Sequence, residues 1–210
     1  MSRRSPLARA PRPDTRVRRG VQFSDTVKAV PGPIVLATDA SVGKDHVGIG
    51  FLSTTGHAGL RAHLYPVHLA RPHTRIVVTE LRAVYWGLQP VLAAHPGRPV
   101  EVRVDSLDAL GHLRAWREGG TRMPKGYDTH LRSQGRTPTL TRLQMLVEYT
   151  PSLTFVHEKA HVGNPLNEAA DSLAKLGLRA VGGKAPVDEI PRLLPLWATG
   201  ALGDYRRSRA

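Results

Sequence analysis

The chain has 210 residues, a net charge of +13 at pH 7 and no cysteine. Without cysteine, disulfides, thiolate zinc sites and cysteine nucleophiles are excluded, so any metal ion must be held by oxygen or imidazole ligands. No apolar run approaches the roughly 20 residues that cross a bilayer, which predicts a soluble, cytoplasmic protein that has no membrane partner.

The first twenty residues form a basic, proline-interrupted arm. Its only acidic residue is Asp14, against seven arginines. Such a segment cannot bury enough apolar surface to fold alone, but it can release counterions from a phosphate backbone. We therefore expect residues 1–31 to be a disordered arm that binds nucleic acid. A solubilising tail or a transit peptide fits the same composition.

Three neighbouring strands are predicted next. Ile34–Asp39 is a short apolar run typical of a central strand buried on both faces, and Asp39 ends it. Val47–Leu52 and Leu60–Leu69 follow on either side of a turn-prone Thr-Thr-Gly, which predicts an antiparallel meander. Pro66 in the third run requires an edge or a bulge.

A helix is predicted after the meander. From Leu81, apolar residues recur at i, i+3, i+4 and i+7, the stripe of a helix packed on a sheet. Glu80 borders this stripe. We expect Pro90 to kink or end the helix, because proline has no N–H to donate.

A second strand and helix follow. Val100–Val104 alternates polar and apolar residues, and Asp105 comes at its end. Ser106 offers cap chemistry for a helix whose apolar stripe ends at Trp116. Asp39 and Asp105 thus both lie at the carboxyl ends of strands, where ligands gather in open α/β sheets.

The remaining chain alternates irregular and regular segments. Residues 118–138 are rich in glycine, proline and basic side chains, which indicates a basic excursion outside the core. A helix from Leu140, a strand at Leu153–Val156 and a last helix opened by Asn164-Pro165 follow. Residues 181–210 form an extension with one apolar cluster, which fits either a docking segment or a loosely packed tail.

Four carboxylates therefore stand at element ends or on helices that could cover the same edge. They are Asp39, Glu80, Asp105 and Asp171. Hard divalent cations prefer oxygen ligands, and without a cation four clustered carboxylates would repel one another. Taken singly, each is as well explained as a helix cap or a solvated helix residue.

The order of these motifs resembles that of the type 1 ribonucleases H. Residues 38–41 (Thr-Asp-Ala-Ser) resemble the end of the family's first strand, 79–83 (Thr-Glu-Leu-Arg-Ala) its first helix, and 104–106 (Val-Asp-Ser) the end of its fourth strand. The most specific resemblance is residues 156–174, which look like the family's histidine loop followed by Asn-Glu, two spacers and the last aspartate. The resemblance covers residues 33–178.

The resemblance implies an α/β domain at residues 32–180, with a five-stranded mixed sheet in the ribonuclease H order, helices on both faces and basic terminal extensions. It implies a two-metal site for Mg²⁺, which Mn²⁺ can replace. Asp39 would bridge both ions, Glu80 and Asp105 would hold one, and Asp171 would hold the other. His161 would assist proton transfer or product release.

Six further residues are expected near the substrate. Ser41 and Ser106 would orient the backbone or the substrate, or serve only as caps. A basic handle that binds the DNA strand would comprise four residues. These are Trp116, Arg117, Arg122 and Lys125. For Trp116, core packing fits as well as base stacking, because the residue continues the helix stripe.

The implied function is endonucleolytic hydrolysis of the RNA strand of RNA–DNA hybrids by a monomer, leaving 5′-phosphate and 3′-hydroxyl ends. The chain departs from the family where asparagines and a glutamine usually touch the RNA. It has Ile76, Val77, Val78 and Leu107 there. Apolar side chains cannot donate hydrogen bonds, so hybrid specificity is open. A nuclease acting on DNA or structured RNA and a non-catalytic nucleic-acid-binding module remain the alternatives.

Overall fold

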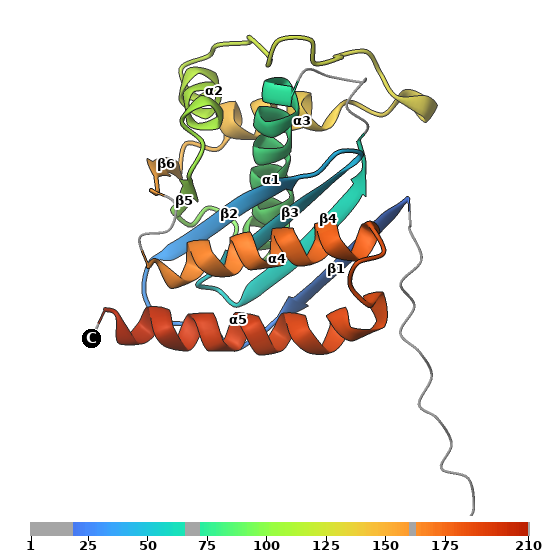
Figure 1. The fold of residues 1–210 in the computed structure, drawn as a ribbon. Coiled ribbons are helices and arrows are strands. Elements are labelled where there is room, and N and C mark those ends of the chain that lie inside the picture. The colour runs from blue at the N-terminus through green and yellow to red at the C-terminus, as the bar shows by residue number, and fades with distance from the viewer. Residues whose placement is uncertain (1–18, 66–71, 160–162, 210) are drawn as a thin grey trace, which may run out of the picture.

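The computed structural model describes residues 19–65, 72–159 and 163–209 (Figure 1). Six strands form one mixed sheet in the order β1-β4-β3-β2-β5-β6. β2 pairs in parallel with β5, and β5 in parallel with β6, whereas the other pairs are antiparallel. The strands are β1 (Gly20–Thr26), β2 (Ile34–Val42), β3 (His46–Ser53), β4 (His57–Leu64), β5 (Val100–Val104) and β6 (Leu153–His157). The predicted mixed α/β class is confirmed.

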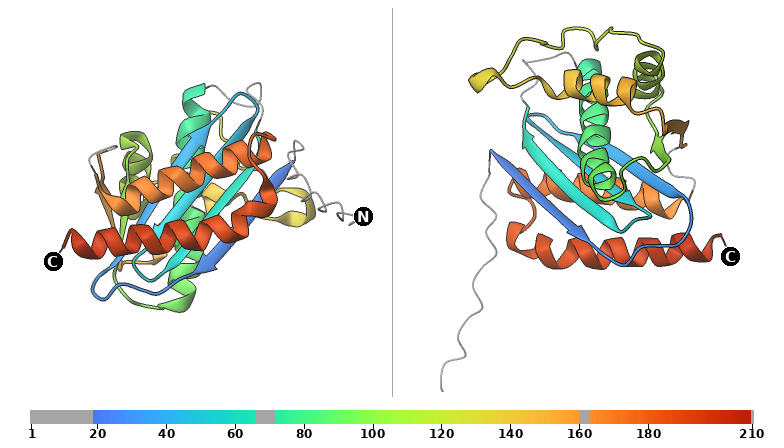
Figure 2. Two further views of the ribbon diagram at one scale, coloured as in Figure 1. Left: turned by 60° about the horizontal axis from the view of Figure 1, so that its bottom comes forward. Right: turned by 180° about the vertical axis from the view of Figure 1, so that it is seen from behind.

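Helices cover both faces of the sheet (Figures 1 and 2). Three of them, α1, α2 and α3, share one apolar core with one face, and α4 and α5 share a second core with the other. The helices are α1 (Pro72–Ala94), α2 (Leu107–Arg117), α3 (Thr139–Tyr149), α4 (Pro165–Val181) and α5 (Ile190–Arg207). No helix in these described ranges is long and apolar enough to span a bilayer.

The alternation of side chains along β2 joins the two cores. Val35 and Ala37 belong to the core under α4 and α5, whereas Ile34 and Leu36 belong to the core under α1. Successive side chains of a strand point to opposite faces, so a strand covered by helices on both sides is apolar throughout. β2 is therefore the central strand that its sequence predicted, but it does not end at Asp39, because it stays paired with β3 as far as Val42.

The expected strand count of five is wrong, because residues 20–26 are not a disordered arm. They form β1, which pairs with β4 from Gly20↔His63 to Thr26↔His57. Val21 is buried and Phe23 packs against the α4–α5 core, so alternate residues of β1 supply the apolar surface that the arginine-rich arm lacks. Residues 1–18 of the expected arm lie outside the described residues.

The C-terminal extension is a docked helix, which decides between the two interpretations left open by its sequence. α5 packs along α4 (Figure 1). Its buried residues recur every three or four positions, the period of an amphipathic helix. They are Ile190, Leu194, Ala198, Leu202 and Tyr205.

Of the two outcomes expected at Pro90, a kink or an end of the helix, the second does not occur, since α1 continues to Ala94. Pro90 leaves one backbone carbonyl of the preceding turn without its helical donor. The residues on either side compensate, because Leu88 and Val91 are fully buried in the core. β4 ends at Leu64, so Pro66, expected within the third strand, lies outside the described residues.

Candidate metal centre

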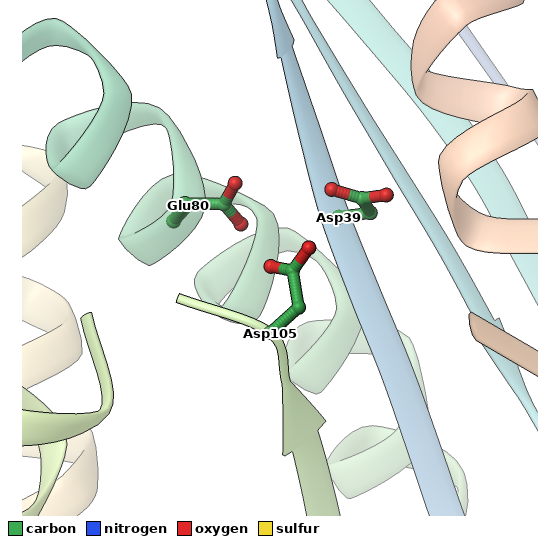
Figure 3. A group of neighbouring side chains, drawn as sticks. All are labelled: Asp39, Glu80 and Asp105. Carbon is green, nitrogen blue, oxygen red and sulfur yellow. The ribbon is translucent and has the colours of Figure 1, made fainter. Parts of the chain in front are cut away.

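Three carboxylates from different elements lie close together near the carboxyl ends of the neighbouring inner strands β2 and β5 (Figure 3). Asp39 lies in β2, Glu80 in α1, and Asp105 directly after β5. One oxygen from each lies within 4.8 Å of the others. β2 and β5 are parallel neighbours in the register Ala37↔Arg103, which brings Asp39 beside Asp105. Asp105 follows the end of its strand as the sequence predicted, whereas β2 continues three residues beyond Asp39. The carboxylates point toward one another (Figure 3).

Burial raises the free energy that is needed to ionise the carboxyl groups of this cluster. Asp39 is 6% exposed and Glu80 5%. Burial, together with the charge of Asp105 and then of Asp171, raises the pKa of Asp39 to about 8, although the Ala40 N–H donates to its Oδ1 at 2.6 Å and opposes the shift. Burial, followed by the charges of Asp39 and Asp105, also raises the pKa of Glu80 well above its usual value. At neutral pH the cluster needs protons or a cation.

The donor set fits a hard divalent cation. All three groups offer oxygen, and the Glu80 Oε2 atom is buried with no hydrogen-bond partner among the described residues. A buried acceptor without a donor costs free energy, which a coordinated cation would offset. Carboxylates that are held by two strands and a helix would need little rearrangement to bind it.

Asp171 approaches this cluster from α4 but is not one of the three convergent groups. Its proximity contributes to the raised pKa of Asp39, and the Lys175 Nζ donates a hydrogen bond to its Oδ2 at 2.7 Å. Lys175 is on the same helix face one turn later, and its pKa is raised mainly by this hydrogen bond. Its ammonium group thus places a positive charge beside the fourth carboxylate.

Two glycines of β3 allow α4 to approach the sheet closely enough to bring Asp171 there. A Cβ atom at Gly50 would lie 2.1 Å from the Ala170 carbonyl oxygen, and one at Gly48 would lie 2.2 Å from that of Ala174. Both distances are far below van der Waals contact. Any side chain at Gly50 would therefore push α4, and Asp171 with it, away from Asp39.

His161 lies outside the described residues, but both ends of its loop are described. Asn164 caps α4, accepting from the Leu166 N–H at 3.1 Å, and its Nδ2 donates to Glu158 Oε2 at 3.0 Å. The same Glu158 oxygen accepts from Arg103 Nη1 at 2.9 Å. These bonds tie the start of α4 to the end of β6 and to β5.

The two serines differ in their surroundings. Ser41 is half-buried in β2, two residues beyond Asp39. Ser106 is the N-cap of α2, with its Oγ accepting from the Ala109 N–H at 3.2 Å. That contact is the cap that the sequence offered as the alternative to a role beside the substrate.

The expected basic handle is divided between core and surface. Trp116 is fully buried, and its Nε1 donates to the Arg122 carbonyl at 3.0 Å, so the interpretation of Trp116 as a base-stacking residue is wrong. Arg117 donates to the carbonyl oxygens of Thr150, at 2.8 Å, and Leu153, and thereby holds the α3–β6 connection.

Arg122 and Lys125 remain available at the surface. Both are exposed and line a groove between the start of α1 and α2, together with His73 and Leu107. Cationic side chains beside an open groove suit contacts with a phosphate backbone. Of the four expected handle residues, these two are therefore the ones exposed beside a groove.

Arg75 is a residue near the centre that the sequence did not single out. It is only 2% exposed, and its Nη2 donates to the carbonyl oxygens of Gly43, at 2.9 Å, and Tyr65, at 2.6 Å. These bonds fix the first turn of α1 to the β2–β3 connection, one turn before Glu80. An arginine in a helix shows no local pattern that would predict such burial.

Comparison with known proteins leaves the family open. No family model matches the chain, and no curated protein does either. A crystal structure of LC11-RNase H1 in complex with an RNA/DNA hybrid is 19% identical, with a TM-score of 0.45, covering 69% of this chain and 96% of that one. The structure of LC11-RNase H1 isolated from compost by a metagenomic approach is 19% identical, with a TM-score of 0.44, covering 70% and 95%. These likenesses are too weak to carry an argument about activity.

Proposed function

We propose that the chain is a metal-dependent endoribonuclease of the ribonuclease H type, which hydrolyses the RNA strand of RNA–DNA hybrids. The observation that carries the proposal is the convergence of Asp39, Glu80 and Asp105, two of them almost fully buried. A binding module gains nothing from buried acids that face phosphates, because these repel its ligand unless cations are present. The motif order in the sequence adds support.

Asp39, Glu80 and Asp105 would hold one Mg²⁺ or Mn²⁺ ion, and Asp39 and Asp171 a second. Two such ions, when bound, activate a water molecule and neutralise the oxygen that leaves in an in-line phosphoryl displacement, giving 5′-phosphate and 3′-hydroxyl ends. Asp39 is suited to the shared position because it interacts with both Asp105 and Asp171. His161 would move a proton near the scissile bond.

The groove that Arg122 and Lys125 line would take the DNA strand, with the basic side chains binding its phosphates. Ser41 would lie near the substrate. Ile76 is 44% exposed and Leu107 67% exposed, at the places where the resemblance expects amide side chains that touch RNA. This observation favours a second candidate function, a nuclease with the same metal chemistry that also cuts another duplex.

Cleavage of an end-labelled RNA–DNA hybrid tests both candidates, alongside RNA duplex, DNA duplex and single strands, with Mg²⁺, Mn²⁺ or a chelator. We expect metal-dependent cutting of the RNA strand of the hybrid. Asp105→Asn should abolish cutting and keep the fold, whereas Asp188→Asn, an exposed acid beside α5, should leave cutting unchanged. Cutting of another duplex would support the second candidate, and binding without any cutting would refute both.

A further inference from the structure

Three arginines gather on the far side of α1 from the carboxylates. Arg61 comes from β4, Arg82 from α1 and Arg142 from α3. Glu80 and Arg82 are two positions apart, which directs their side chains about 200° apart around the helix axis. Both neighbours of Arg61 in β4 pack toward α4 and α5, so Arg61 projects from the opposite face of the sheet. We call these three residues the arginine cluster.

Each guanidinium group of the arginine cluster lies over an aromatic ring. The distances from Cζ to the ring centroid are 4.1 Å for Arg61 over Trp86, 4.9 Å for Arg142 over Tyr85 and 5.0 Å for Arg82 over Tyr65. A guanidinium attracted to a ring in this way is restricted in position and keeps N–H groups that can form bidentate hydrogen bonds. The rings thus help to position three guanidinium groups.

Within residues 19–65, 72–159 and 163–209, no arginine of the cluster forms an ion pair with a carboxylate. Burial, and then the positive charges of Arg82 and Arg142, lower the pKa of Arg61. Three cations that repel one another without a counter-charge destabilise the fold, and an anion from outside would relieve the repulsion.

His63 supports the cluster without adding charge. Burial and the neighbouring arginines lower its pKa to about 4, so its ring is neutral at pH 7. A guanidinium has only donors, so Arg82 Nη1 donates to His63 Nε2 at 3.2 Å. This bond leaves the ring proton on Nδ1, which is buried and has no partner among the described residues. His63 therefore orients Arg82 and leaves its charge for a ligand.

We propose that the arginine cluster is a second nucleic-acid contact, which binds phosphodiester oxygens of a backbone that runs beyond the metal centre. Guanidinium groups cover ring faces on which bases would otherwise stack, so the contact reads phosphate and not sequence. On this side of the sheet no helix of the described residues lies over β1 (Figure 2, right), and the exposed Gln22 of β1 is the register partner of Arg61. A backbone therefore has access.

This inference goes beyond the proposed hydrolysis and does not depend on it, so its test is made in a chelator. Binding of a long RNA–DNA hybrid and of a DNA duplex would be measured over a range of salt concentrations. The variant is Arg61→Gln with Arg142→Gln. Its control, Arg98→Gln with Arg206→Gln, removes equal charge from exposed positions outside the cluster.

Each lost phosphate contact lowers the magnitude of the slope of log K against log salt by about 0.9. We therefore expect this magnitude to fall by about 1.8 for the cluster variant, which loses two contacts, and to change little for the control. Equal changes in the two variants would refute the contact. If the double variant unfolds, Arg142→Gln alone, at an exposed position, should lower the slope by about 0.9.

Photocrosslinking provides a second measurement that keeps all three arginines. A photoreactive residue in place of Gln22 should crosslink to the nucleic acid, and one in place of the exposed Thr199 on α5 should not. The assignment would be overturned if the residue at position 22 did not crosslink to the nucleic acid. It would also be overturned if polyglutamate, but not single-stranded DNA, competed for this crosslink. Retained crosslinking together with no RNA cleavage in Mg²⁺ would instead count against the proposed hydrolysis alone.

Discussion

Asp39 illustrates how burial and charge at one residue link metal binding to stability. Its pKa rises from 3.8 to about 8 in the folded protein. Between these values the folded state binds a proton that the unfolded state has lost, so the stability of the metal-free protein falls as pH rises from about 4 to about 8. A bound cation would remove this penalty by replacing the proton.

Asp39→Asn should therefore stabilise the metal-free protein at pH 8 and abolish its stabilisation by Mg²⁺. The amide cannot ionise, so we expect a gain of one to a few kcal/mol in chelator, on the scale of about 1.4 kcal/mol for each pKa unit. Denaturant unfolding at pH 5 and pH 8, with chelator or Mg²⁺, measures both effects. Asp188→Asn should show neither, and a pH dependence unchanged by Asp39→Asn would contradict the argument.

At the scale of elements, the close packing of α4 against β3 determines whether Asp171 lies near Asp39. Gly50→Ala should destabilise the protein by about 1–3 kcal/mol, because its Cβ would meet the Ala170 carbonyl oxygen at 2.1 Å. It should also weaken Mg²⁺ binding by displacing Asp171. Thermal unfolding and a metal titration measure the two effects.

Gly111→Ala is the matched control for this substitution. Gly111 lies inside α2, where a Cβ atom would meet no other part of the protein within 4 Å. Alanine there should stabilise the protein by about 0.5–1 kcal/mol, because it favours the helix. If Gly50→Ala were equally stabilising, the close approach of α4 would not restrict this position.

Sequence signals predicted the parts of the fold that repeat locally. Asp39 follows a continuous apolar run and Asp105 an alternating one, and both runs were recognised as strands whose acidic residues would lie where ligands gather. β1 was missed because its partner β4 is distant in the chain and because its short alternation directly follows the arginine-rich arm. Trp116 continued an apolar helix stripe, so periodicity favoured the core, and the expectation from the resemblance misplaced it. Which interpretation holds depends on tertiary packing that no local pattern contains.

α5 was equally ambiguous from its sequence, because Pro191 and Pro195 argue against a helix while its apolar residues have a helical period. Packing against α4 decides the outcome.

The docking of α5 can be tested at one buried residue. Leu194→Ala should cost about 2–5 kcal/mol of unfolding free energy, since its side chain is 1% exposed in the core. Leu196→Ala, at 60% exposure, should change stability by less than about 0.5 kcal/mol. Equal costs would mean that α5 does not dock in solution.

At the scale of the whole molecule, the charge of +13 is unevenly distributed. Acids gather at the metal centre, whereas the arginine cluster, the groove with Arg122 and Lys125, and the N-terminal residues carry cations. Positive surfaces around an acidic centre attract a phosphate backbone and leave the centre to bind cations. Affinity and hydrolysis should therefore be separable, because different residues carry them.

Deletion of residues 1–18 tests this separation and keeps β1, which begins at Gly20. The deletion removes six arginines and one aspartate. If this arm binds phosphates, the salt slope of hybrid binding should fall, by at most about 0.9 for each arginine that makes a contact. Single-turnover cleavage at saturating protein and Mg²⁺ should keep its rate, since the four carboxylates remain in place. An unchanged slope would assign the arm a role other than nucleic-acid binding, and a lost cleavage rate would show that the arm acts in catalysis.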